Sequence, residues 1–322
     1  MRVNAKDPLI SSRAAGQRGS RGGSEVSMDC STAGRRAPRV NPKLALVIGI
    51  SAVSSASILI RLSIAPPLVI AGFRLAIASA IMGILAISSI GQLRSLDRGE
   101  IAAILVSGLA LGGHFGTWTA SLLYTTIAAS TVIVDSSPIF VVLISWILLG
   151  ERINRREALG IAISIAGSVV IAGGDLLRGG GFLGDMLSLV GAILLAIYLV
   201  AGRKLRRKLD LAPYTFVVYG LAAVTLVLSA VMAGNSLVGY RVEDYILFLL
   251  LAVGPSCLGH NSYNYALKYL KAAVVSASIL GEPVGASILG VIVFGEVPPL
   301  TTVLGGAVVL FGVYLTVSSE PS

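Results

Sequence analysis

The stretch that decides the fold is residues 131–151, which read TVIVDSSPIFVVLISWILLGE. Most of it is an apolar run suited to lipid, yet Asp135 and Pro138 stand in its middle. A carboxylate at the centre of a bilayer is costly, and a proline inside a helix removes a backbone hydrogen bond. Both are tolerated at membrane depth where the chain borders a water-filled cavity. The stretch therefore indicates a transmembrane segment that lines a cavity inside the protein.

The composition places the whole chain in a membrane. Of its 322 residues, 55% are hydrophobic and only 13% are charged, and the mean hydropathy is +0.87. A soluble domain carries about 25% charged residues. The apolar residues form continuous runs, which favours helices, because the strands of a membrane barrel alternate apolar and polar positions. Runs long enough to cross about 30 Å of hydrocarbon lie at about 43–61, 67–90, 100–120, 124–149, 157–174, 183–202, 212–233, 244–267, 271–294 and 299–317.

Positive charge is concentrated on one side of these predicted membrane segments. The net charge is +9, and Lys and Arg gather in the first 40 residues and in the loops after the second, fourth, sixth and eighth runs. The positive-inside rule therefore predicts a multi-pass protein of the cell membrane with both termini in the cytoplasm. We interpret residues 1–40 as a disordered basic cytoplasmic tail and expect no nucleic-acid partner.

The chain repeats itself after 145 residues without a gap. Pro138 then aligns with Pro283, and Gly150–Glu151 aligns with Gly295–Glu296. Because each half holds five runs, an odd number, the second half enters the membrane in the opposite orientation. The predicted fold class is an all-α integral membrane protein, with ten transmembrane helices as two inverted five-helix repeats around a central cavity. The predicted repeats span 41–178 and 186–318.

A family resemblance is carried by residues 125–171, TTIAASTVIVDSSPIFVVLISWILLGERINRREALGIAISIAGSVVI, and by residues 271–315, KAAVVSASILGEPVGASILGVIVFGEVPPLTTVLGGAVVLFGVYL. Both resemble the end of an EamA repeat, the domain of the drug/metabolite transporter superfamily. The shared features are a small-residue stretch, a mid-run proline, Gly-Glu at the turn and two glycines seven residues apart. The resemblance implies ten helices around a central cavity, and an exporter or exchanger of small metabolites, amino acids among them.

Asp135 and Glu282 are the most unusual polar residues of the apolar runs. Each lies near the middle of its run and within one helical turn of an aligned proline. We expect both carboxylates to face the central cavity, where they bind a substrate ammonium or load and release a proton. A purely structural role, holding helices together, is the alternative. Pro138 and Pro283 are predicted hinges, because each removes a helical hydrogen bond.

Other polar residues inside the runs complete the predicted site. Arg74 has three open interpretations: a side chain that snorkels outward, an ion pair with Asp135, or a bidentate partner for a substrate carboxylate. For an amino-acid substrate, Arg74 takes the carboxylate, and Glu282 or Asp135 takes the ammonium. Trp118, near the end of a run, is interpreted as an interfacial anchor. The remaining candidates for substrate binding or proton coupling are His114, His260, Asn261, Tyr263 and Asn264.

The leading function is a secondary transporter that exports or exchanges small metabolites such as amino acids by alternating access. A multidrug/proton antiporter is the alternative within this class, and a membrane-embedded enzyme or a channel are the other classes. We expect no enzyme, because the sequence holds no GxxxxGK[ST], HExxH or GxSxG motif. No cofactor and no metal site are expected. The expected partners are a small-molecule substrate, the lipid bilayer and, as an open alternative, protons; no oligomeric state is predicted.

Overall fold

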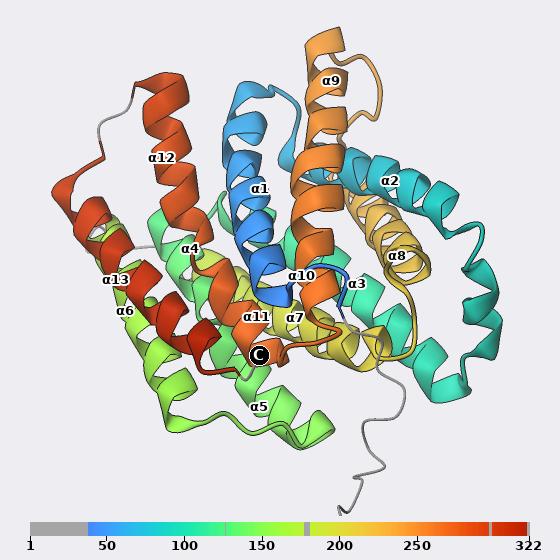
Figure 1. Cartoon of the computed structure of the whole chain (residues 1–322). Coiled ribbons are helices and arrows are strands. Elements are labelled where there is room, and N and C mark those ends of the chain that lie inside the picture. Colours follow the sequence, from blue (N-terminus) through green and yellow to red (C-terminus); the bar gives the residue numbers. More distant parts are fainter. Residues whose placement is uncertain (1–37, 126, 177–180, 296–297, 321–322) are drawn as a thin grey trace, which may run out of the picture. The chain divides into compact units, whose positions relative to one another are not determined.

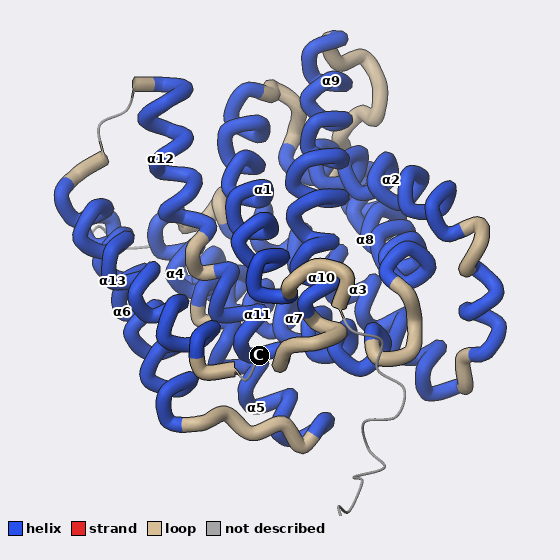
Figure 2. The backbone as a smooth tube through the Cα atoms, in the orientation of Figure 1, coloured by secondary structure: helices blue, strands red, loops and turns tan. Residues whose placement is uncertain are grey.

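The computed structural model describes residues 38–125, 127–176, 181–295 and 298–320. These residues are helical with connecting loops and contain no strand (Figures 1 and 2). The tail predicted at 1–40 lies almost wholly outside the described residues, and so does Glu296. The helices are α1 (Pro42–Leu62), α2 (Pro67–Ala86), η1 (Ile90–Ser95), α3 (Arg98–Ser121), α4 (Ile127–Asp135), α5 (Ser137–Leu149), α6 (Arg155–Leu176), α7 (Phe182–Arg206), α8 (Leu211–Met232), α9 (Val242–Leu251), η2 (Ala252–His260), α10 (Asn261–Ala266), α11 (Ala272–Ile279), α12 (Glu282–Phe294) and α13 (Leu300–Ser318).

The all-helical membrane class is confirmed. Within the described ranges, eight helices are long and apolar enough to cross a membrane, counting α9 to α10 and α11 to α12 as continuous segments. The pair α4 and α5 contributes a shorter apolar helix over 133–149. The predicted count of ten transmembrane helices therefore stays a prediction.

Two segments are interrupted at the aligned prolines. The first helix break lies between α4, which ends at Asp135, and α5, which begins at Ser137. The second helix break lies between α11, which ends at Ile279, and α12. In each case the proline of the following helix has no N–H to bond the carbonyl four residues earlier, so the helix cannot continue regularly. Both α5 and α12 then end at a left-handed glycine, with φ 65° at Gly150 and 66° at Gly295.

Helices α6 and α13 cross closely through small residues. A Cβ atom on Gly160 would lie 2.6 Å from the Gly312 carbonyl oxygen, and one on Gly167 would lie 2.8 Å from that of Gly305. The reversed order of these pairs shows that the two helices run antiparallel. Only glycine permits such an approach of the two backbones.

The remaining helices pack in reciprocal pairs. α2 packs on α8, α3 packs on α7, and α1 packs on η2 and α10. α1 also contacts α12, as α7 contacts α4 and α5, and α11 contacts α5. Exchanging every helix for its partner 145 residues away reproduces these contacts, apart from that of α11 with α5. The two halves of the chain are therefore interlocked rather than side by side, and both helix breaks come to lie in the interior (Figure 1).

Candidate functional site

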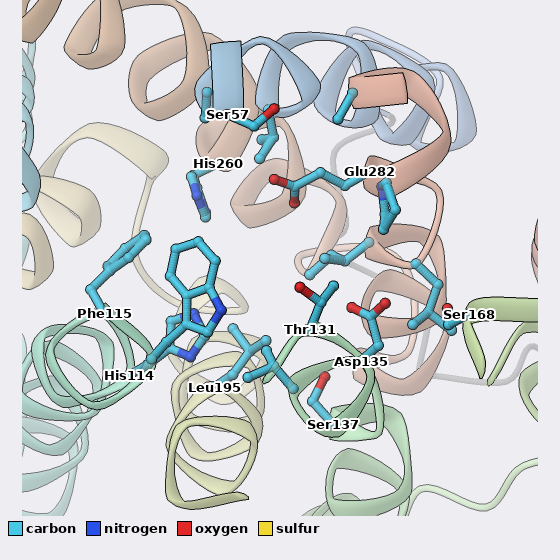
Figure 3. Close-up of a pocket in the computed structure, with 18 of the residues that line it drawn as sticks. Ser57, His114, Phe115, Thr131, Asp135, Ser137, Ser168, Leu195, His260 and Glu282 are labelled. Carbon is cyan, nitrogen blue, oxygen red and sulfur yellow. The ribbon is translucent and has the colours of Figure 1, made fainter. Parts of the chain in front are cut away.

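A cavity of about 560 Å³ lies between the two helix breaks. Its wall is built from both halves of the chain, because α1 to α6 supply one part and α7, η2, α10, α11 and α12 supply the other. Most of the wall is apolar, and the polar side chains fall into two groups on opposite sides (Figure 3). The predicted site residues on this wall are Arg74, His114, Asp135, His260, Tyr263, Glu282 and the hinge residue Pro283.

One side of the cavity carries both carboxylates. Asp135 is the last residue of α4 and Glu282 the first of α12, so each helix break aims one acid inward. Asp135 Oδ2 is buried and has no hydrogen-bond partner. The Ser54 hydroxyl on α1 donates to the backbone oxygen of Glu282 at 3.2 Å, which ties the second helix break to α1. Pro138 is buried behind this side and is not part of the cavity wall.

Arg74 lies beside Phe115, which is across the cavity from Asp135 in Figure 3, and it does not snorkel outward, since its side chain is only 3% exposed. Its Nε donates to Ser256 Oγ at 3.1 Å, and its Cζ lies 4.9 Å from the centre of the Phe115 ring. Nη2 is buried without a hydrogen-bond partner. Arg74 forms no ion pair with Asp135 in the described part of the chain, although Glu282 is close enough to attract its charge. One edge of the guanidinium is therefore available to a ligand.

Two histidines and a tyrosine flank this basic side. His114 Nδ1 lies 2.9 Å from the Gly191 carbonyl oxygen, which fixes the ring against α7. The His260 ring meets Phe115 edge to face at 5.9 Å and Tyr263 at 6.1 Å between ring centres. The Tyr263 hydroxyl is buried, lines the cavity and has no hydrogen-bond partner. It is a second unused polar group that a ligand could bind.

The structure places Asn261 and Asn264 behind the cavity wall rather than on it. Tyr219 donates to Asn261 Oδ1 at 2.9 Å, and Tyr198 donates to Asn264 Oδ1 at 2.9 Å. Both amides are buried in a polar network between α7, α8 and α10. Such a satisfied network holds helices in register. In this conformation neither amide can reach a molecule in the cavity.

Several wall residues were not anticipated from the sequence. Trp118, expected as an interfacial anchor, instead lines the cavity one turn beyond His114. Thr131 lines it one turn before Asp135. In both cases the spacing of four residues on one helix was the available signal. No such signal pointed to Ser168, at the far end of α6, because only the tertiary fold brings α6 against α4.

One end of the helices is closed by ion pairs between the two halves, and we call it the basic end. Glu151 Oε1 accepts hydrogen bonds from Arg203 and Arg207, each at 2.8 Å. Lys208 pairs with Glu100 at 2.6 Å. Lys271 pairs with the fully buried Glu157 at 2.7 Å, which makes this pair harder to separate. The basic end is therefore held shut across the boundary between the halves.

Away from these ion pairs the cavity continues into a smaller recess of about 330 Å³. The two spaces share Ser57 of α1 and Ala286 of α12 as wall residues. The recess extends along α12 to Pro298 and Pro299, which precede α13. Arg61 at the last turn of α1 also lines it and lies over the Phe294 ring, with 4.6 Å from Cζ to the ring centre. The recess is a route into the cavity from the end opposite the basic end.

Comparison with known proteins identifies both halves of the chain. The model of the EamA-like transporter family matches twice, at residues 43–173 and 182–318. An uncharacterized transporter of Archaeoglobus fulgidus is 27% identical over 225 residues, which cover 69% of this chain and 76% of that protein. A probable terminal-alkyne amino-acid exporter of Streptantibioticus cattleyicolor is 27% identical over 255 residues, which cover 77% and 80%. A crystal structure of a protein with 21% identity shares the fold, with a TM-score of 0.70 over 85% of this chain and 96% of that one.

Proposed function

Because this chain belongs to the EamA-like transporter family, we propose that it is a secondary transporter that exports or exchanges amino acids or closely related zwitterionic metabolites across the cell membrane. The resemblance to EamA repeats that the sequence suggested is thereby confirmed, and membrane transport is the activity of the family. The substrate class is our own inference. It rests on the cavity, and the amino-acid exporter among the relatives agrees with it.

The observation that carries the proposal is the separation of charge across the cavity. Arg74 offers an unpaired guanidinium edge beside Phe115, and Figure 3 shows Phe115 across the cavity from Asp135 and Glu282. An α-amino acid carries a carboxylate and an ammonium close together, and these two groups match the two sides. Guanidinium binds carboxylate in a bidentate manner, and a buried carboxylate binds ammonium strongly in low dielectric. The apolar remainder of the wall then receives the side chain.

The transport cycle that we propose is alternating access between two inverted repeats, 41–178 and 186–318. The reciprocal helix contacts and the antiparallel crossing of α6 and α13 support this relation. The described conformation is closed at the basic end, which we assign to the cytoplasm from the positive-inside rule. Both termini then lie in the cytoplasm as well. Opening inward requires the Glu151, Glu100 and Glu157 ion pairs to separate while Pro138 and Pro283 bend.

Counterflow in proteoliposomes tests the proposal. Vesicles loaded with an unlabelled amino acid should accumulate the labelled one in a saturable manner, for at least one member of an amino-acid panel. Glu282→Gln should lower the initial rate by about tenfold or more, because an amide cannot balance the ammonium charge. Glu243→Gln is the matched control, since Glu243 is exposed at the start of α9. An imposed pH gradient in the same vesicles separates proton-coupled transport from facilitated exchange.

Failure of every amino acid in this assay would overturn the proposed substrate class. A multidrug antiporter is the second candidate, and one observation favours it. Phe115 and Trp118 give the cavity an aromatic surface that faces two carboxylates, which suits a flat organic cation. Such a substrate has no carboxylate, so Arg74→Lys should leave cation efflux unchanged but should weaken the counterflow of an amino acid.

A further inference from the structure

We propose that the first helix break forms a binding site for Na⁺, built from Asp135 and the neutral oxygens around it. The site would couple transport to the sodium gradient, and this role rests on the proposed function. Binding itself does not, because it can be measured on the purified protein without any transport.

The first argument is that the oxygens at this break are not fully satisfied. Asp135 Oδ2 lines the cavity without a hydrogen-bond partner, and Ser168 Oγ, also on the wall, has no partner besides the neighbouring Asp135 carboxyl. Ser168 lies beside Asp135 and is only 3% exposed, so water in bulk does not satisfy it. The carbonyl of Val134 has lost its helical donor, because Pro138 has no N–H. A buried polar group that is not fully hydrogen-bonded is costly, so a ligand that contacts all three oxygens is favoured.

The second argument is the kind of atoms that gather there. Thr131, Asp135, Ser137 and Ser168 lie together on one side of the cavity in Figure 3. One carboxylate, three hydroxyls and a carbonyl at the end of a half-helix are all hard oxygen donors. Hard cations prefer such donors, and half-helix carbonyl ends are used for Na⁺ in other transporters. A proton on Asp135 would satisfy one carboxylate oxygen only, whereas a metal ion contacts the whole set.

The third argument is charge. No basic side chain pairs with Asp135 in the described ranges, and Glu282 is near enough to repel its charge. Arg74, which Ser256 holds, is the one Lys or Arg among the described residues of the cavity wall. With both carboxylates ionised, the cavity therefore has one negative charge in excess, which a monovalent cation balances. The described residues hold no group of three or more His, Cys, Asp or Glu that would suit a divalent metal.

The experiment measures Na⁺ binding to the detergent-purified full chain. Thermal unfolding is followed in NaCl, KCl and choline chloride at equal ionic strength, and ²²Na⁺ binding is counted directly on the same samples. We expect Na⁺ alone to raise Tm, by roughly 3 °C at ten times its Kd. Asp135→Asn should abolish this shift, and Ser168→Ala should weaken Na⁺ binding about tenfold. Ser164→Ala is the matched control, because Ser164 lies one turn earlier on α6 and its hydroxyl bonds Val309 instead.

An equal Tm in the three salts, without bound ²²Na⁺, would overturn the site. So would a Na⁺ shift that survives in both Asp135→Asn and Ser168→Ala, because the ion would then bind elsewhere. A shift that follows pH but not Na⁺ would assign the break to a proton. Counterflow in Na⁺-free choline medium is run in parallel, so that loss of the transport function and loss of the sodium site are recognised separately.

Discussion

The two helix breaks share one backbone design and differ in chemistry. Both stop a helix at an aligned proline, and the helices that follow have the same length and end at a left-handed glycine. The first break carries Asp135 and is faced by Ser168, whereas the equivalent positions 145 residues later hold Leu280 and Val313. The second break instead places its acid, Glu282, where the first has Ser137. The comparison shows that the two repeats share one backbone arrangement at their helix breaks. Differences in single side chains at aligned positions give each break its own chemistry.

The largest effect should come from giving the second break the acid of the first. Leu280 is 1% exposed and packs with Val309 and Val313 at the edge of the cavity wall, so Leu280→Asp places a carboxylate against apolar side chains. An unpaired buried charge costs about 3–5 kcal/mol, and we expect a steep loss of folded protein. Size-exclusion profile and Tm in detergent measure it, with Leu280→Met as the control of similar volume. A Leu280→Asp protein as stable as the wild type would show that the second break already faces water.

A smaller effect, on the rate of counterflow, should follow when either proline is replaced. Pro138→Ala and Pro283→Ala each restore a backbone donor, for the Val134 and Ile279 carbonyls respectively. Stiffer breaks should slow counterflow by about tenfold in both variants, since hinge residues set the rate of opening. Only Pro138→Ala should also weaken Na⁺ binding, because only Val134 belongs to the proposed site. Equal Na⁺ affinities in the two variants would remove Val134 from the donor set.

The smallest effect concerns the hydroxyl that ties the second break to α1. Ser54 Oγ lies 3.2 Å from the Glu282 backbone oxygen and also bonds Ile50 at 2.7 Å. Ser54→Ala should raise the counterflow KM about fivefold, because one buried hydrogen bond contributes about 1 kcal/mol. Ser55→Ala is the control, since Ser55 bonds only the Ala52 carbonyl of its own helix. Identical KM values in the two variants would show that α1 does not position Glu282.

The sequence was sufficient to predict the all-helical class and the alignment of the two helix breaks. Continuous apolar runs fix an all-helical membrane protein, and the 145-residue register correctly aligned Pro138 with Pro283 at two helix breaks. The same register aligned Gly150 with Gly295, and both adopt positive φ. These features are local, because a proline or a left-handed glycine acts within one helical turn.

The residues that line the site were harder to predict from the sequence, because they depend on which face of each helix turns inward. Asn261 is as polar as His260, the residue before it. Because successive residues of a helix point in different directions, Asn261 points away from the cavity and bonds Tyr219. Trp118 lies near the end of a predicted run, where an interfacial anchor is expected, and the packing of α3 on α7 turns it into the cavity instead. Ser168 becomes part of the site only through the contact of α6 with α4. Polarity alone does not distinguish a cavity residue from a helix-packing residue.

The most direct test of the central claim, that the substrate occupies this cavity, is protection of an engineered thiol. Ala286→Cys is introduced into a Cys30→Ala, Cys257→Ala chain and treated with a membrane-impermeant thiol reagent applied opposite the basic end. Ala286 lines both the cavity and the recess, whereas the control position Ser287→Cys lines only the recess.

We predict that both thiols react from this side. Substrate at ten times its Kd should slow the Ala286→Cys reaction by about tenfold, because only about one protein in eleven is then unoccupied. The Ser287→Cys rate should change far less. Unchanged labelling of Ala286→Cys at saturating substrate would contradict the account and would place transport outside this cavity.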